Sequence, residues 1–92
     1  MTVEVGPVLL PSELGRAVLS AIRAGNPAVR VWDRGAYLRV LSPGRCAVTR
    51  AAIEEALGRA FALPADLELC MASFKGRLSV DTERAIWEAA EP

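Results

Sequence analysis

The chain has 92 residues, which is enough for one domain and too few for two. Eleven basic residues balance eleven acidic ones, so the sequence lacks the basic excess expected of a general nucleic-acid binder. Histidine is absent, which excludes serine–histidine–aspartate triads, cysteine–histidine pairs and imidazole metal ligands. We therefore expect a single domain over residues 1–92 that is not itself an enzyme.

The first quarter of the chain predicts a strand followed by a helix. Residues 3–10 are rich in β-branched residues, and Gly6-Pro7 within them predicts an edge strand or a kink. Ser12 is suited to cap a helix whose first turn carries Glu13. An apolar stripe at helical spacing extends this helix to about residue 24: Leu14, Ala17, Val18, Ala21 and Ile22. The segment Gly25-Asn26-Pro27 then ends it.

The middle of the chain predicts a hairpin, a short strand and a second helix. Residues 29–33 and 36–41 read as strands joined by the turn Asp33-Arg34-Gly35. Residues 46–48 form a short strand, after which Thr49 is placed to cap a helix that ends at Gly58. The expected buried stripe of this helix is Ile53, Ala56 and Leu57.

The last third predicts two strands and an ambiguous tail. Residues 67–72 alternate, which places Leu67, Leu69 and Met71 on one face of a strand and Glu68 and Cys70 on the other. Phe74-Lys75-Gly76 breaks this strand, and residues 77–81 alternate again. Residues 84–90 favour helix by composition, although their Ile86-Trp87 core could instead finish a strand. The whole pattern predicts an α+β fold of two β-α-β-β units, with helices packed on antiparallel strands.

The two cysteines, Cys46 and Cys70, do not make a zinc site without further ligands, and they form no CxxC motif. The N-terminus lacks a signal peptide, and no apolar run reaches the ~18 residues that cross a membrane. We therefore expect a cytoplasmic protein with reduced thiols and no membrane contact. For Cys70, packing or a protein interface is favoured over thiol chemistry, because no histidine can activate it and Glu68 would raise its pKa.

Two further features have alternative explanations. Asp33 and Arg34 could form a recognition tip, or they could simply satisfy turn chemistry. Trp32 could pack in the core or act as an interface residue. The glycines form no phosphate-binding motif, and the few aromatics form no stacking platform for RNA. The residues alone therefore predict a binding or regulatory module without naming its partner.

Four stretches, spread over nearly the whole chain, carry a resemblance to a known family. They are VGPV at 5–8, NPAVRVWDRGAYLRV at 26–40, TRAAIEEALGRAF at 49–61 and DLELCMASFKGRLS at 66–79. In this order and spacing they resemble the effector, or coupling, proteins of soluble bacterial multicomponent diiron monooxygenases. That family serves methane, phenol, toluene and alkene oxygenases, and the resemblance is closest to its toluene and aromatic branch.

The resemblance implies a fold of two strand-helix-strand-strand units and a protein without metal or organic cofactor. Such a protein docks on the diiron hydroxylase component, interacts with the reductase and ferredoxin only indirectly, and is a monomer when free. Docking tunes substrate access, oxygen activation and the coupling of electron delivery to product formation. A different class remains as the alternative, namely a stand-alone ferredoxin-like small-molecule-binding or sensor module.

The resemblance also implies a hydroxylase interface. The strand and turn over 69–76 supply Cys70, Ala72, Ser73, Phe74 and Gly76 to it. The sequence departs from its relatives at Cys70, where they commonly carry asparagine, so an amide that could bond the partner is missing. A second motif supplies Asn26, Asp33, Arg34 and Tyr37, which either contact the hydroxylase or maintain the turn and hairpin.

Overall fold

The computed structural model describes residues 2–90. Its elements in chain order are β1 (Glu4–Leu9), α1 (Glu13–Gly25), β2 (Arg30–Asp33), β3 (Leu38–Pro43), β4 (Arg45–Thr49), α2 (Arg50–Leu57), α3 (Ala65–Cys70), β5 (Met71–Lys75), β6 (Arg77–Val80) and β7 (Arg84–Glu88). The predicted α+β class, with helices packed on antiparallel strands, is confirmed.

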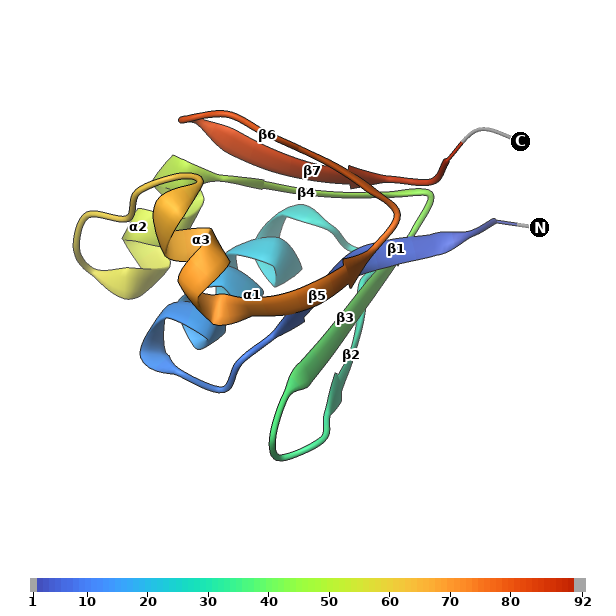
Figure 1. Cartoon of the computed structure of the whole chain (residues 1–92), viewed down its shortest axis with the longest axis horizontal. Helices are drawn as coiled ribbons and strands as arrows, with labels where there is room; N and C mark the ends of the chain where they lie inside the picture. Colours follow the sequence, from blue (N-terminus) through green and yellow to red (C-terminus); the bar gives the residue numbers. More distant parts are fainter. Residues whose placement is uncertain (1, 91–92) are drawn as a thin grey trace.

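The strands form two sheets, one with the order β2-β3-β1-β5 and the other with the order β4-β7-β6. All their pairings are antiparallel. The sheets meet near the start of β1 and the end of β7 and diverge toward the side where the three helices lie (Figure 1). Because β5 comes from the second half of the chain and completes the first sheet, the two halves do not form separate bodies.

Strand β1 lies in the middle of the four-stranded sheet, so of the two predicted alternatives, an edge strand or a kink, the edge strand is wrong. The ladder to β3 pairs residues 4, 5, 8 and 9 of β1 and leaves Gly6 and Pro7 without a partner there. Gly6 has φ +151°, and a Cβ at this position would lie 2.4 Å from the carbonyl oxygen of Val40. A central strand tolerates Pro7 because the neighbouring glycine lets the two backbones approach closely where the ladder is interrupted.

The first two helices begin as predicted. The Ser12 hydroxyl accepts a hydrogen bond from the Gly15 amide at 3.1 Å, and the Thr49 hydroxyl accepts one from the Ala52 amide at 3.1 Å. The predicted stripe of α1 faces the core, although Leu14 is only half-buried. The predicted stripe of α2 is only partly correct. Ile53 is buried, whereas the other two predicted residues, Ala56 and Leu57, are not.

The predicted strand over residues 67–72 is wrong in its first part. Residues 65–70 form α3, and β5 begins only at Met71. Leu67 and Cys70, three residues apart, are both about 1% exposed, whereas Leu69 is 69% exposed. This burial follows helical spacing, and a six-residue alternation is too short to exclude it. The prediction that Cys70 lies on the same strand face as Glu68, away from Leu67, is therefore also wrong.

Residues 84–88 form β7, the central strand of the second sheet, so the strand alternative for the tail is correct. Its inward residues Ala85 and Trp87 are fully buried. Hydrogen bonding of β7 to β4 on one side and to β6 on the other outweighs the helix-favouring composition of this segment. The second half therefore carries an additional helix, α3, and an additional strand beyond a simple β-α-β-β unit. No helix within residues 2–90 is long and apolar enough to span a membrane.

Candidate functional site

One face of the four-stranded sheet points away from the core. Strand pairing aligns one outward row across the sheet: Trp32, Arg39, Val8 and Ser73. In the adjacent row, the central residues Leu38 and Leu9 are buried. Since side chains alternate along each strand, the two rows belong to opposite faces.

A shallow hollow of about 410 Å³ opens on this outward face at its hairpin side. It is lined by Val8, Leu10, Ala36, Tyr37, Arg39, Ala72 and Ser73. The hollow thus brings Tyr37 of the second motif together with Ala72 and Ser73 of the first. A register shift between Val8 and Leu9 makes Ala72 the additional residue of β5, as in a β-bulge.

A second, smaller hollow of about 120 Å³ lies beside the first. Its lining consists of Gly6, Val8, Arg39, Val40, Leu41, Ser73, Phe74 and Lys75. Phe74 is 45% exposed. It pairs with buried Pro7, so alternation places its ring at the β5 edge, on the opposite side of the sheet from Ser73 and Lys75. Arg39, Val8 and Ser73 line both hollows and therefore lie between them. We call the surface formed by the two hollows the sheet face.

The β2–β3 hairpin ends at one border of the sheet face. The Asp33 carboxylate accepts a hydrogen bond from the Gly35 amide at 2.9 Å, and the Arg34 amide donates one to the Tyr37 carbonyl at 2.9 Å. Asp33 therefore has a turn-forming role. Both Asp33 and Arg34 are exposed, so their side chains remain accessible to a partner.

Asn26, in contrast, is 9% exposed and joins α1 to β4. Its side-chain amide donates to the carbonyls of Ile22 and Ala47, at 2.7 and 2.8 Å. Its side-chain oxygen accepts from the Ala47 amide at 3.1 Å. These bonds use both amide protons, so Asn26 stabilises the fold and does not belong to the exposed surface.

Two other predicted interface residues, Cys70 and Gly76, are also constrained by the fold. Cys70 is 1% exposed at the end of α3. Gly76 lies in the turn between β5 and β6 with φ +102°, and a Cβ there would lie 2.7 Å from Val5 Cγ1 and 2.8 Å from the Glu88 carbonyl oxygen. Only glycine fits this close approach of the turn to both sheets.

Neither thiol is activated. Burial raises the pKa of Cys46 to about 12. Burial, assisted by the nearby negative charge of Asp66, raises the pKa of Cys70 to about 11. Both thiols are therefore protonated at neutral pH, and nucleophilic chemistry at Cys70 has no support. Within residues 2–90 no cluster of three or more cysteine or carboxylate side chains could hold a metal ion.

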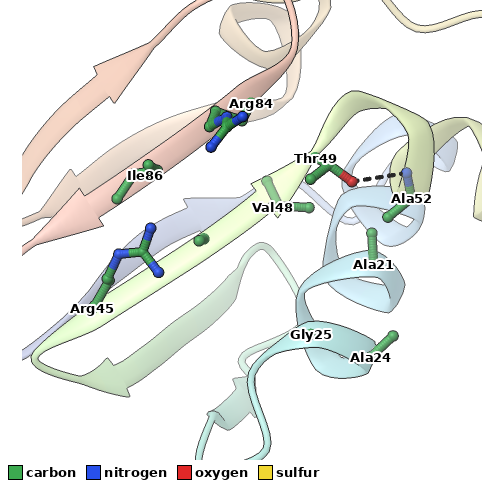
Figure 2. A pocket seen from close by; sticks show the side chains of 10 residues that line it. Ala21, Ala24, Gly25, Arg45, Val48, Thr49, Ala52, Arg84 and Ile86 are labelled. Atoms are coloured by element: carbon green, nitrogen blue, oxygen red, sulfur yellow. Dashed lines mark hydrogen bonds between the residues drawn. The ribbon is translucent and has the colours of Figure 1, made fainter.

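The second sheet also carries a hollow, of about 450 Å³, between the end of α1, the start of α2 and the strands β4 and β7 (Figure 2). Ile86 lies between the two arginines of its lining, Arg45 and Arg84. The rest of the lining is made of small or apolar residues and Thr49, whose hydroxyl caps α2. This is the cavity that a small-molecule-binding module would use.

The sequence interpretation missed several residues of the sheet face, notably Val8, Leu10, Arg39 and Lys75. For Arg39 a signal existed, because it alternates with buried Leu38 and Val40 on the same side as Tyr37. For Val8 and Leu10 no local signal existed. Their place beside Ser73 depends on which strands pair.

The fold is that of monooxygenase regulatory proteins. A chain in the structure of a phenol hydroxylase–regulatory protein complex superposes with a TM-score of 0.85 at 23% identity, covering 96% of this chain and all of that one. The soluble methane monooxygenase regulatory protein B superposes with a TM-score of 0.71 at 26% identity. In that case 95% of this chain matches 65% of a longer protein.

Sequence comparison narrows this class to one family. Residues 3–88 match the MmoB/DmpM family, and the chain belongs to it. The chain is 46% identical over 85 residues to the effector subunit of the alkene monooxygenase system of Xanthobacter autotrophicus strain Py2, covering 90% of this chain and 83% of that protein. The family resemblance carried by the four stretches is thereby confirmed, whereas its closeness to the toluene branch stays a prediction.

Proposed function

We propose that this protein is the effector subunit of a multicomponent monooxygenase, which binds the diiron hydroxylase component and is not itself a catalyst. The observation that carries the proposal is the 46% identity to an alkene monooxygenase effector subunit over 90% of the chain. The shared fold with regulatory proteins of phenol hydroxylase and methane monooxygenase supports it. We place the protein in the cytoplasm together with its partner.

The physical basis of such regulation is a population shift. A protein that binds one hydroxylase conformation more tightly than another must favour that conformation, by the ratio of the two affinities. A change that opens or closes the route to the diiron site then controls substrate access, oxygen activation and coupling. This requires a well-shaped binding surface and no cofactor.

The sheet face is our proposed hydroxylase contact. Tyr37, Ala72 and Ser73 line its larger hollow, and Phe74 lies at the adjoining β5 edge. Tyr37 and Phe74 are exposed aromatics of the kind that dominate protein interfaces. Asp33 and Arg34 lie at its hairpin border. Asn26 and Cys70 are buried, and Gly76 lies in a turn that packs against both sheets, so we assign these three residues to the fold and not to the contact.

The decisive experiment is reconstitution with the hydroxylase and electron-transfer components from the same organism. We expect the protein to bind the hydroxylase in calorimetry and to raise the product formed per reductant consumed. A double variant, Tyr37→Ala with Phe74→Ala, should lose both effects while keeping its circular dichroism spectrum. Unchanged turnover and coupling upon addition of the wild-type protein would contradict the proposal.

The hollow between α1 and the second sheet favours one alternative, a stand-alone small-molecule-binding or sensor module. That function requires a ligand that raises the melting temperature as its concentration increases. It also predicts that Ala24→Trp, at an exposed position of the hollow's lining, abolishes the shift. Hydroxylase binding, together with no ligand that raises the melting temperature, would exclude the sensor module and retain the effector function.

A further inference from the structure

The charges around the sheet face are unevenly distributed. Four cations lie on the outward side of the four-stranded sheet or at its hairpin, namely Arg30, Arg34, Arg39 and Lys75, against two carboxylates, Glu4 and Asp33. The whole chain has equal numbers of basic and acidic residues, so this surface is basic relative to the rest of the molecule.

Both carboxylates are already engaged. Glu4 forms an ion pair with Arg30, whose guanidinium also lies 5.1 Å from the centre of the Trp32 ring. Asp33 accepts the turn hydrogen bond from Gly35. Within residues 2–90, Arg39 and Lys75 have no ion-pair partner. Two cations without a partner therefore adjoin the hollows.

Arg39 occupies the central position, because it lines both hollows and pairs with Val8 in the middle of the sheet. Lys75 lies on β5, two strands from β3, and pairs with Gly6, which is two positions along β1 from Val8. With strands ~4.8 Å apart and ~3.4 Å per residue, the two Cα atoms are separated by about 12 Å. Half-buried Val8 and exposed Ser73 lie between them on the same side of the sheet.

We infer that the sheet face recognises an acidic surface of the hydroxylase, with Arg39 anchoring one carboxylate and Lys75 attracting a second. The inference rests on the proposed function and adds the chemistry of the partner's docking site. A planar guanidinium can hold a carboxylate with two parallel hydrogen bonds, and arginine at the centre of an interface is a frequent anchor. Lys75, as a compact charge near the border, contributes to steering.

The test is calorimetric binding of effector variants to the purified hydroxylase from the same organism, at several salt concentrations. We expect Arg39→Glu to weaken binding by at least about 10-fold and to flatten its salt dependence. Arg39→Lys should fall between Arg39→Glu and the wild type, because it keeps the charge and loses the paired hydrogen bonds. Lys75→Glu should mainly slow association.

Arg16→Glu is the matched control. It makes the same change of charge on exposed α1, beside α2 and away from the sheet face, and Arg16 has no ion pair within residues 2–90. Binding of Arg39→Glu within about 2-fold of wild type, or equal losses for Arg39→Glu and Arg16→Glu, would overturn the acidic-surface inference and leave the effector function intact. A wild-type protein that does not bind the hydroxylase would overturn both.

Discussion

At the scale of single residues, Asn26 shows how a candidate interface residue can serve the fold instead. Its side chain makes three hydrogen bonds that join the end of α1 to β4. The sequence showed only an Asn-Pro segment after a helix, which is equally compatible with a helix stop and a recognition turn. Burial and the contact with Ala47, 21 positions away, decide between these interpretations.

We expect Asn26→Asp to destabilise the protein by about 2–4 kcal/mol, because a carboxylate cannot donate to the two carbonyls and is repelled by them. Urea unfolding followed by circular dichroism measures the change. Ser20→Ala, at an exposed position of α1, serves as the control and should change stability by less than about 0.5 kcal/mol. A loss of hydroxylase binding by Asn26→Asp at full stability would instead restore Asn26 to the interface.

The buried thiols predict a loss of stability in alkaline solution. The pKa of Cys46 rises from 9.0 to about 12 and that of Cys70 to about 11 on folding, so above pH 9 the unfolded chain releases protons that the folded protein keeps. The stabilising contribution is complete below pH 9 and is lost as the pH rises toward the folded values. Each thiol should reduce the unfolding free energy by about 1.4 kcal/mol per pH unit in this range.

Urea unfolding at pH 8, 9, 10 and 10.5 measures this slope for the wild type and for a Cys46→Ala, Cys70→Ala double variant. The double variant should be less stable at pH 8 and show a shallower decline above pH 9. Equal slopes for the two proteins would show that the thiols do not titrate as their burial requires.

At the scale of elements, β5 both completes the four-stranded sheet and presents exposed residues to a partner. It forms an edge of the four-stranded sheet and pairs with β1, while Ala72, Ser73 and Phe74 stay exposed. The sequence interpretation found these three residues through family resemblance, although it began the strand four residues too early. Alternation over 67–72 fits a strand and a short helix turn equally well, and packing of Leu67 and Cys70 against the core selects the helix.

Phe74→Ala should weaken hydroxylase binding by about 2 kcal/mol or more and change folding stability by less than about 1 kcal/mol, because the side chain is 45% exposed. Calorimetry and urea unfolding give the two quantities. Val80→Ala, on the exposed edge strand β6, is the control and should change neither. A stability loss of about 3 kcal/mol for Phe74→Ala would instead identify Phe74 as a core residue.

At the scale of the whole molecule, the two sheets share one core and are joined by backbone hydrogen bonds around Gly44. The Gly44 amide donates to Val3 at 2.8 Å, and the Gly44 carbonyl accepts from Ala89 at 3.0 Å. The turn at Gly76 packs against Val5 of the first sheet and Glu88 of the second. We therefore expect the sheets to unfold together.

Single-tryptophan variants test this cooperativity, since Trp32 lies in the first sheet and Trp87 in the second. Trp87→Phe breaks no hydrogen bond, because the buried indole nitrogen has no partner within residues 2–90, so its cost is that of a smaller ring in the core. In both Trp32→Phe and Trp87→Phe, the fluorescence and circular dichroism midpoints in urea should coincide. Separate midpoints in either variant would show that one sheet unfolds independently.

The sequence by itself determined the α+β class, the caps of α1 and α2, the β2–β3 hairpin and the family, because these depend on local spacing or on motifs that persist along the chain. Tertiary structure alone decided the central position of β1, the strand at β7, the burial of Cys70 and Asn26, and the sheet face that gathers Val8, Arg39 and Ser73. The physical reason is that strand partners and side-chain burial depend on contacts between residues far apart in the chain, which local patterns do not encode.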